Sequence, residues 1–264
     1  MSNGDHRDNR DNRIVVITGA SSGIGASLAE LVAAGGASVA LVARREELLR
    51  AVASRCGDHA LALTADVTRR EDVRRVVDES LRRFGRIDVW VNNAGQGITR
   101  LPSELTDEDV DDMMRVNVKS ALYGMQEVLP HFKSSGASGR GHVINISSML
   151  GRVPSVTIRS AYCASKHYLN ALTAMFRDEV RQTHPAIQFS IVSPGIVRTG
   201  FGLSARHGGA DSRQLPDGQS QEEVAAVIAG VIKSRAPDQY TRAGAHDRVV
   251  SYYASLGVDP VTNR

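Results

Sequence analysis

The stretch IVVITGASSGIG, residues 14–25, joins a buried strand to a glycine-rich turn and the start of a helix. Its first five residues form a β-branched apolar run, typical of a strand buried on both faces. Gly19, Gly23 and Gly25 let the backbone turn sharply and approach a pyrophosphate, and the helix beyond offers free N–H groups to the anion. The spacing is GxxxGxG and not the usual GxGxxG, so an ordinary glycine-rich turn is the alternative. Position after the first strand favours dinucleotide binding.

Apolar runs of the same kind alternate with amphipathic stretches along the chain, which predicts a parallel sheet with helices on both faces. Strands are expected at 14–18, 38–43, 60–64, 87–91, 142–146 and 187–192, and helices near 24–34, 45–55, 69–84, 106–132, 160–183 and 220–234. Thr106, followed by acidic residues, is a candidate helix cap. We expect a disordered lead-in over 1–12 and a single α/β domain over 13–264. Residues 200–219 lack periodicity, which predicts a mobile loop at the substrate site.

Composition excludes several classes of function. The formal net charge is only +3, from 32 Lys and Arg against 29 Asp and Glu, so nucleic-acid binding is not expected. The longest apolar run falls short of the roughly 20 residues that a membrane span needs, and residues 1–13 do not resemble a secretory signal. Cys56 and Cys163 lack disulfide or metal-ligand spacing. We therefore predict a soluble cytoplasmic protein without a metal site.

The second and third strands end in residues that can contact an adenosine. The position for a ribose-binding acid holds Ala43, followed by Arg44 and Arg45. A guanidinium binds a 2′-phosphate that a carboxylate would repel, so NADP(H) is favoured over NAD(H), although NAD(H) is possible. Arg44 is the stronger candidate, since Arg45 can equally be a solvated residue at a helix start. Asp66 and Val67 can contact the adenine, and a helix cap at Asp66 is the alternative.

The stretch YCASK, residues 162–166, places a phenol and an ammonium on one face of a predicted helix. An isolated YxxxK pair would by default be an ordinary helix surface. Here it follows an NNAG turn (Asn92–Gly95), Asn117 in RVNVK and an ISS stretch, and precedes SPGIVRT. Together with TGASSGIG, these motifs resemble the short-chain dehydrogenase/reductase family over roughly residues 13–200.

The resemblance implies a single Rossmann-type, doubly wound parallel sheet of about seven strands in the order 3-2-1-4-5-6-7. It also implies hydride transfer between a nicotinamide and a carbonyl or secondary alcohol. Residues carried over to cofactor binding are Gly19, Ser21, Ser22, Gly23, Ile24, Gly25, Arg44, Arg45, Asp66, Val67, Asn93, Ala94, Gly95, Tyr162, Lys166, Pro194, Gly195, Val197 and Thr199.

The catalytic residues implied by the resemblance are Asn117, Ser148, Tyr162 and Lys166. Tyr162 would be the general acid or base, and Ser148, in preference to Ser147, would polarise the carbonyl. Lys166 would tune the phenol and hold the nicotinamide ribose, while Asn117 would hold a water against the lysine. Moving a phenol pKa from about 10 toward 7 takes roughly 4 kcal/mol. One ammonium about 4 Å away supplies that at an effective dielectric near ~20, before desolvation opposes it.

The substrate is a small carbonyl or alcohol compound, and the sequence does not identify it. Candidate pocket walls are Gln96, Ile98, Leu150, Val153, Val156, Phe201 and Leu203. Arg159 and Arg206 are candidates for binding an acidic substrate group, with solvated loop arginines as the alternative. Other functions left open are a 3-oxoacyl thioester reductase and a non-catalytic dinucleotide sensor. The C-terminal segment 243–264 lacks the VDGG-like turn of many tetrameric family members, so a homo-oligomer is expected without a choice between dimer and tetramer.

Overall fold

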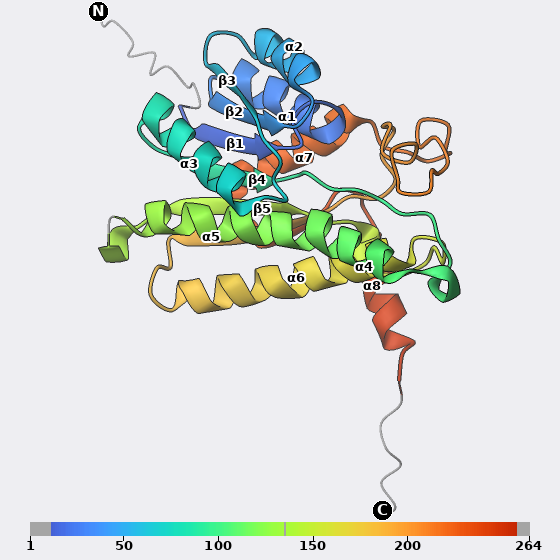
Figure 1. Ribbon diagram of the computed structural model, residues 1–264. Helices are drawn as coiled ribbons and strands as arrows, with labels where there is room; N and C mark the ends of the chain where they lie inside the picture. The colour runs from blue at the N-terminus through green and yellow to red at the C-terminus, as the bar shows by residue number, and fades with distance from the viewer. Residues whose placement is uncertain (1–11, 135, 258–264) are drawn as a thin grey trace, which may run out of the picture.

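The structure is a computed structural model that describes residues 12–134 and 136–257. Its strands form one parallel sheet in the order β3-β2-β1-β4-β5-β6-β7, which confirms the predicted order (Figure 1). The strands are β1 (Ile14–Thr18), β2 (Ser38–Ala43), β3 (Ala60–Thr64), β4 (Val89–Asn92), β5 (Gly141–Ile146), β6 (Ile187–Ser193) and β7 (Asp238–Tyr240). The predicted lead-in, residues 1–12, lies almost entirely outside the described residues.

Helices cover both faces of the sheet, as strict strand–helix alternation predicts. They are α1 (Gly23–Ala34), α2 (Glu46–Cys56), α3 (Arg70–Phe84), α4 (Asp107–Met114), α5 (Ser120–Lys133), α6 (Ser160–Arg181), α7 (Gln221–Ser234) and α8 (Ala245–Ala254). One core layer packs α1, α2 and α7 against the sheet, and the other packs α3, α5 and α6 against the opposite face.

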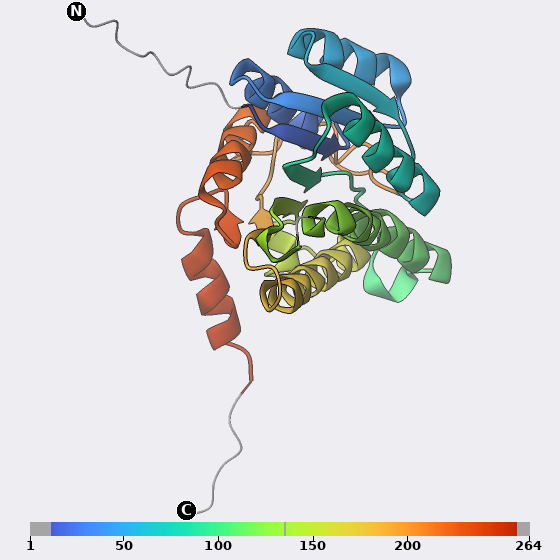
Figure 2. The same cartoon turned by 90° about the vertical axis from the view of Figure 1, so that its left-hand side faces the viewer.

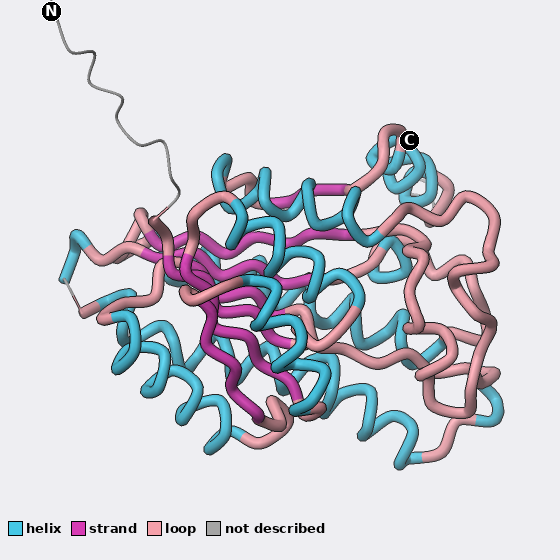
Figure 3. Tube along the Cα trace, turned by 90° about the horizontal axis from the view of Figure 1, so that it is seen from above, coloured by secondary structure: helices cyan, strands magenta, loops and turns pink. Residues whose placement is uncertain are grey.

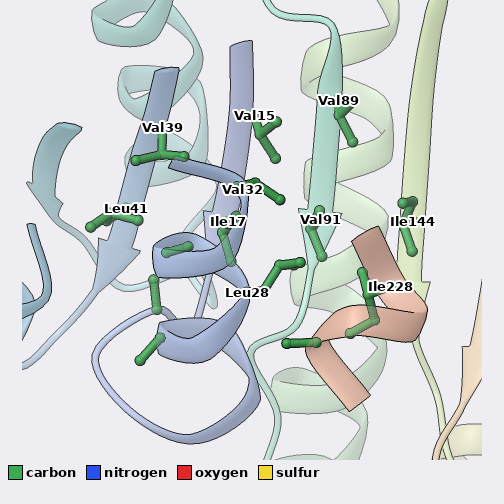
Figure 4. Close-up of a cluster of buried hydrophobic side chains, with 14 of the residues drawn as sticks. Val15, Ile17, Leu28, Val32, Val39, Leu41, Val89, Val91, Ile144 and Ile228 are labelled. Carbon is green, nitrogen blue, oxygen red and sulfur yellow. The ribbon is translucent and has the colours of Figure 1, made fainter. Parts of the chain in front are cut away.

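Strand β1 contributes side chains to the first core layer, and all of its residues are buried. In Figure 4, Leu28 of α1 and Ile228 of α7 lie against the strands that carry Ile17 and Val91. Successive strand residues point to opposite faces, so Val16 packs into the other layer. Burial on both faces explains why the strand sequences are continuously apolar and do not alternate.

The strand order reverses next to β1, which pairs with β2 on one side and with β4 on the other. The connections from these strands leave in opposite directions and open a crevice beyond their carboxyl ends. Figure 3 shows the loops gathered beyond one end of the strands. The sheet topology therefore places the glycine-rich turn, the NNAG turn and the segment after β5 around one crevice.

The predicted helix at 106–132 is two helices joined by a π-helical segment, Arg115–Lys119. Its N-terminal cap is as expected: the Thr106 hydroxyl accepts from the Asp109 N–H, and the Asp109 carboxylate accepts from the Thr106 N–H. One extra residue in a helical turn leaves no signal in an apolar pattern, and such segments occur frequently at functional sites. Asn117 lies in the middle of this one.

The C-terminal part of the chain contains β7 and α8, neither of which the apolar pattern indicated. Strand β7 has three residues and pairs only with β6 among the described strands. Helix α8 extends away from the sheet (Figure 2) and buries mainly Ala245 and Val249. No helix among the described residues has the length and apolarity needed to cross a membrane.

Candidate active site

A cavity of about 1670 Å³ lies at the carboxyl ends of the strands. It is lined by all the predicted site residues except Gly25 and Asn117. Both exceptions are buried, Gly25 within the glycine turn and Asn117 within the π-helical segment. The structure thus collects residues from seven separate segments around one space, which is large enough for a dinucleotide and a second small molecule.

The glycine turn and the NNAG turn are held against each other. Gly19 has a φ of +67°, and a Cβ there would lie 2.9 Å from the Ala94 Cα. A Cβ on Gly25 would lie 2.5 Å from the Gly19 carbonyl oxygen. The Asn93 amide donates to the carbonyls of Thr18 and Gly19, at 2.9 and 3.2 Å. The close approach of the two turns therefore requires that Gly19 and Gly25 carry no side chains.

Thr18 is a supporting residue that sequence reasoning missed. Its hydroxyl accepts from the N–H groups of Asn93 and Ala94, at 3.0 and 3.1 Å, and donates to the Val91 carbonyl at 3.2 Å. This one buried hydroxyl joins the ends of β1 and β4 beneath the cavity. A hydroxyl residue closing an otherwise apolar strand is the signal that could have identified it, because buried polar groups in proteins are nearly always bonded.

The adenosine end of the cavity is basic. Arg45 donates from Nη2 to the hydroxyls of Ser21 and Ser22, at 3.0 and 2.7 Å. Arg44 is exposed and forms no hydrogen bond or ion pair within the described residues. Asp66 accepts from the N–H and hydroxyl of Thr68. Burial raises the pKa of Asp66, but these bonds outweigh it and lower the pKa overall.

Tyr162 lies in the first turn of α6, with its side chain buried at the cavity wall. Burial raises the pKa of the phenol to about 12, although a hydrogen bond with Ser148 and the charge of Arg159 lower it. The expected pKa near 7 is therefore not produced by the chain alone, because desolvation of the phenolate dominates. At neutral pH the group is a protonated phenol that can donate to a developing alkoxide.

Lys166 lies one helical turn beyond Tyr162, as the YxxxK spacing predicts. Its Nζ donates to the Ile146 carbonyl at 2.8 Å and lies 5.7 Å from the centroid of the Tyr162 ring. Burial lowers the pKa of Lys166 to about 8, so the amine carries its charge at pH 7. The ammonium is thus anchored to the end of β5 while it faces the phenol.

Asn117 is connected to the same centre through the π-helical segment. Its Oδ1 accepts from the Gln96 N–H at 2.8 Å, and its Nδ2 donates to the Gln96 carbonyl and to the Ser165 hydroxyl, at 2.9 and 3.1 Å. The Ser165 hydroxyl in turn donates to the Tyr162 carbonyl. Ser165 was not predicted from the sequence. Asn117 therefore ties the loop after the NNAG turn to helix α6.

The two serines after β5 differ in their surroundings. Ser148 caps the short turn Met149–Gly151 by accepting from the Leu150 N–H at 3.1 Å, and it reaches Tyr162. The Ser147 hydroxyl is buried and has no hydrogen-bond partner among the described residues. Only Ser148 therefore shares a hydrogen bond with the phenol.

The substrate end of the cavity has mainly apolar walls. Gln96, Leu150, Val153, Val156 and Phe201 line it as expected, and Ile158 and Met149 add to it. Two expected wall residues are absent: Ile98 is fully buried in the core and Leu203 points to solvent. The rings of Phe201 and Tyr162 lie 5.7 Å apart. An apolar molecule can therefore reach the phenol.

Arg206 is not free to bind a substrate. It forms ion pairs with Asp109 at 2.5 Å, with Asp112 and with Glu108. Burial raises the pKa of Asp109, but the hydrogen bonds from His207 and Arg206 outweigh it and hold the pKa below its usual range. These ion pairs attach the loop after β6 to the buried carboxylate of α4. No local sequence pattern indicates this pairing, because its partners are far apart in the chain.

Comparisons with known proteins agree with this architecture. The family model described as short chain dehydrogenase matches residues 13–208. An uncharacterized oxidoreductase of Staphylococcus saprophyticus is 38% identical over 195 residues, which cover 71% of this chain and 79% of the relative. The chain belongs to the short-chain dehydrogenase family. Short-chain dehydrogenases are oxidoreductases that depend on a nicotinamide dinucleotide, and this short-chain dehydrogenase is such an enzyme.

Solved structures show the same fold and both cofactors. A short-chain dehydrogenase from Streptomyces avermitilis is 32% identical, with a TM-score of 0.79 and coverage of 93% of this chain and 94% of that chain. An alcohol dehydrogenase from Thermococcus sibiricus, complexed with 5-hydroxy-NADP, is 26% identical with a TM-score of 0.74 and coverage of 87% and 95%. A Burkholderia phymatum family member in complex with NAD has a TM-score of 0.84 at 24% identity, a likeness of fold alone, with coverage of 96% and 99%.

The residues of this short-chain dehydrogenase fit a dinucleotide. The glycine turn lines the cavity, and side chains at Gly19 or Gly25 would collide with backbone. Arg44 and Arg45 line the other end. No group of three or more His, Cys, Asp or Glu side chains among the described residues is placed to hold a metal ion.

Proposed function

We propose that this enzyme is an NADPH-dependent carbonyl reductase, reversible as an alcohol dehydrogenase, with Tyr162 as its general acid and base. The observation that carries the proposal is the buried phenol of Tyr162. It shares a hydrogen bond with Ser148, faces the Lys166 ammonium and lies in the same cavity as the glycine turn. An acid, a carbonyl-polarising donor and a cofactor cradle are the parts that ketone reduction requires.

The side chains have distinct tasks in this proposal. Bound dinucleotide supplies the hydride. Ser148 donates to the carbonyl oxygen and polarises it, and Tyr162 transfers its proton to the alkoxide that develops there. The apolar walls around Phe201 exclude water, which strengthens both hydrogen bonds. Lys166 holds the ribose hydroxyls with its remaining N–H donors and stabilises the phenolate that Tyr162 leaves. Asn117 positions the water that returns a proton through Lys166.

Replacing Ser148 by Ala is expected to lower kcat about a hundredfold, since one donor to the developing oxyanion is lost. Ser147→Ala is the matched control. Its hydroxyl has no partner among the described residues, and removing such a group is nearly neutral. Steady-state kinetics of the two variants make the comparison. A larger loss in the Ser147 variant would reassign the carbonyl donor.

The preference for NADPH rests on the two arginines beyond β2. Arg44 has no ion-pair partner within the described residues. Arg45 donates hydrogen bonds to Ser21 and Ser22 of the glycine turn. Both arginines line the cavity, and the position for a ribose-binding acid at the end of β2 holds Ala43, which favours the 2′-phosphate. We propose that Arg44 binds the phosphate while Arg45 orders the turn.

Arg44→Asp is expected to shift the ratio of kcat/KM for NADPH and NADH about a hundredfold toward NADH, because a charged hydrogen bond becomes a repulsion. The matched control is Arg50→Asp, on the exposed face of α2, where the arginine pairs with Glu46 and does not line the cavity. An unchanged ratio in the Arg44 variant would remove this residue from cofactor selection.

The proposed function is tested by a screen of ketones, aldehydes and secondary alcohols that follows the absorbance of each reduced nicotinamide. We expect oxidation of NADPH with apolar ketones and slower oxidation of NADH. Turnover of NADH alone would contradict the cofactor assignment. Absence of turnover with every compound and both cofactors would contradict the carbonyl-reductase proposal.

A second candidate function is the reduction of 3-oxoacyl thioesters on an acidic carrier. Arg198, Arg242 and Arg248 line the cavity and have no carboxylate partner within the described residues. A basic cavity mouth favours an acidic carrier through electrostatic complementarity. Comparing the rates on a 3-oxoacyl carrier and on the free 3-oxoacyl ester distinguishes this function from the first.

We also propose that the protein forms a homo-oligomer. Helices α6 and α8 and the residues just after α8 expose large apolar side chains to solvent, namely Tyr168, Met175, Val250, Tyr253 and Leu256. A second copy can cover such side chains through a symmetric contact. Light scattering that finds only monomers would contradict this.

A cytoplasmic location is proposed from the cysteines. Cys56 and Cys163 are both free thiols, and burial raises the pKa of both, that of Cys56 to about 11. Protonated, unpaired thiols fit a reducing compartment. Cell fractionation that recovers the protein outside the cytoplasm would contradict the proposal.

A further inference from the structure

Arg159 lines the substrate end of the cavity and has no carboxylate partner within the described residues. Arg159 is the residue directly before α6 and lies three residues before Tyr162. It is partly buried and lines the cavity. It forms no ion pair within the described residues. The positive charge of Arg159 also lowers the pKa of Tyr162, so the guanidinium acts directly on the proposed acid.

Backbone, and not a carboxylate, fixes the position of this guanidinium. Nη1 donates to the Ile98 carbonyl at 3.1 Å. A Cβ on Gly97 would lie 2.9 Å from Nη1, and one on Gly209 would lie 3.0 Å from Nη2. The group is therefore wedged between two glycines. Its Nε and Nη2 donors form no hydrogen bond within the described residues, and they are the edge that binds a carboxylate through two parallel bonds.

Three neighbouring cationic side chains are paired with one buried carboxylate. Arg100, Arg206 and His207 all contact the buried Asp109 carboxylate, at 3.1, 2.5 and 2.8 Å. That carboxylate is fully occupied by these three partners. A partly desolvated charge without compensation is unfavourable, and proteins otherwise pair it. Arg159, unlike Arg100, Arg206 and His207, has no carboxylate partner within the described residues.

A second polar group lies beside Arg159. The Thr99 Oγ1 is buried and has no hydrogen-bond partner among the described residues. It would lie 3.0 Å from the same Cβ on Gly209 that approaches Nη2. Buried hydroxyls without a partner are rare. The guanidinium and the hydroxyl together offer donors to an anion at one end of an otherwise apolar pocket.

We propose that the substrate is an apolar oxo acid or hydroxy acid whose carboxylate binds Arg159 while its carbonyl or hydroxyl carbon lies at Tyr162. This inference rests on the proposed reductase function and specifies its substrate class. Arg159 and Tyr162 line the same cavity and the charge of Arg159 acts on the phenol, so one small molecule can contact both side chains. The apolar walls at Leu150, Val153 and Val156 contact the rest of the chain.

The test compares each acid with its own neutral ester. The compounds are 2-oxohexanoate, 3-oxohexanoate and 4-oxohexanoate with their methyl esters, assayed with saturating NADPH. For the wild type we expect kcat/KM for the best acid to exceed that for its ester about tenfold or more. Arg159→Met is expected to lower the value for the acid by about ten- to a hundredfold and that for the ester by less than about twofold. Arg159→Lys, which keeps the charge without the fork, should lie between them.

Arg50→Met is the control, because Arg50 is exposed on α2, pairs with Glu46 and does not line the cavity, so the variant removes one positive charge and leaves Arg159 in place. Its effect on the acid-to-ester ratio should be less than about twofold after screening by salt. Equal losses for acid and ester in Arg159→Met would overturn the proposal, as would an equal change of ratio in Arg50→Met. A wild type without preference for any of the acids would also overturn it.

Failure of the reductase proposal is recognised separately. If neither acids nor esters are turned over, the binding of the hexanoates to the NADPH-loaded protein is measured by calorimetry. Weaker binding of the acid in Arg159→Met, and not in Arg50→Met, would support carboxylate recognition even then. Equal binding by the three proteins, or no binding at all, would overturn it.

Discussion

Tyr162→Phe is expected to abolish turnover, with a loss in kcat of about a thousandfold or more, because the variant lacks the only proton that the mechanism transfers to the alkoxide. The phenol is buried and carries a raised pKa of about 12, so it is protonated across the neutral range. Ketone reduction by the wild type should therefore show no dependence on Tyr162 ionisation between about pH 6 and 9. Alcohol oxidation should accelerate as pH rises, because it requires the phenolate.

The dissociation constant of NADPH, measured by the fluorescence of the reduced nicotinamide, should change less than about threefold in Tyr162→Phe. Phe keeps the ring and its packing against Phe201, and the glycine turn is untouched. Tyr168→Phe is the matched control, since Tyr168 lies on the same helix but is 52% exposed. A Tyr162 variant with a rate within tenfold of wild type would contradict the acid assignment, as would a loss of equal size in the Tyr168 variant.

Local patterns predicted most of the fold because each strand is buried on both faces. Such a strand must be apolar throughout, so IVVIT at 14–18 and SVALVA at 38–43 have the boundaries that the sequence indicates. The pattern fails where burial is slight. Strand β7 is three residues long and begins with the exposed Asp238. The π-helical segment around Asn117 was not predicted for a different reason. One inserted residue changes the apolar pattern of a long helix too little to be recognised in the sequence.

The candidate site was predictable to the extent that its residues lie in local motifs. The glycine turn, the NNAG turn and YCASK each carry their chemistry in a few consecutive residues. The pKa of Tyr162 was not predictable, because it depends on how much water the assembled walls exclude. The sequence also did not indicate which arginines are paired with carboxylates in the folded protein. Arg206 is neutralised by Asp109, 97 residues away along the chain, whereas Arg159 is not.

Lys166→Met is expected to lower kcat for alcohol oxidation about a hundredfold and to move its pH dependence upward. The ammonium lies 5.7 Å from the Tyr162 ring centroid. A positive charge beside the phenol favours the phenolate over the neutral form. Without it the pKa of Tyr162 rises, so the phenolate forms only at higher pH. The measurement is the rate of NADP⁺ reduction across the pH range in which the variant stays folded.

The pH dependence of alcohol oxidation by the wild type should also reflect the ionisation of Lys166 itself. Burial lowers the pKa of Lys166 to about 8, so its charge is present below that pH and is lost above it. Support for the phenolate therefore weakens as pH rises through 8, and the increase of the oxidation rate should flatten there; in Lys166→Met this flattening should be absent. Lys119→Met is the matched control, because Lys119 is exposed and does not line the cavity. A Lys166 variant with the wild-type profile would separate the amine from the phenol and leave it only the contact with the cofactor ribose.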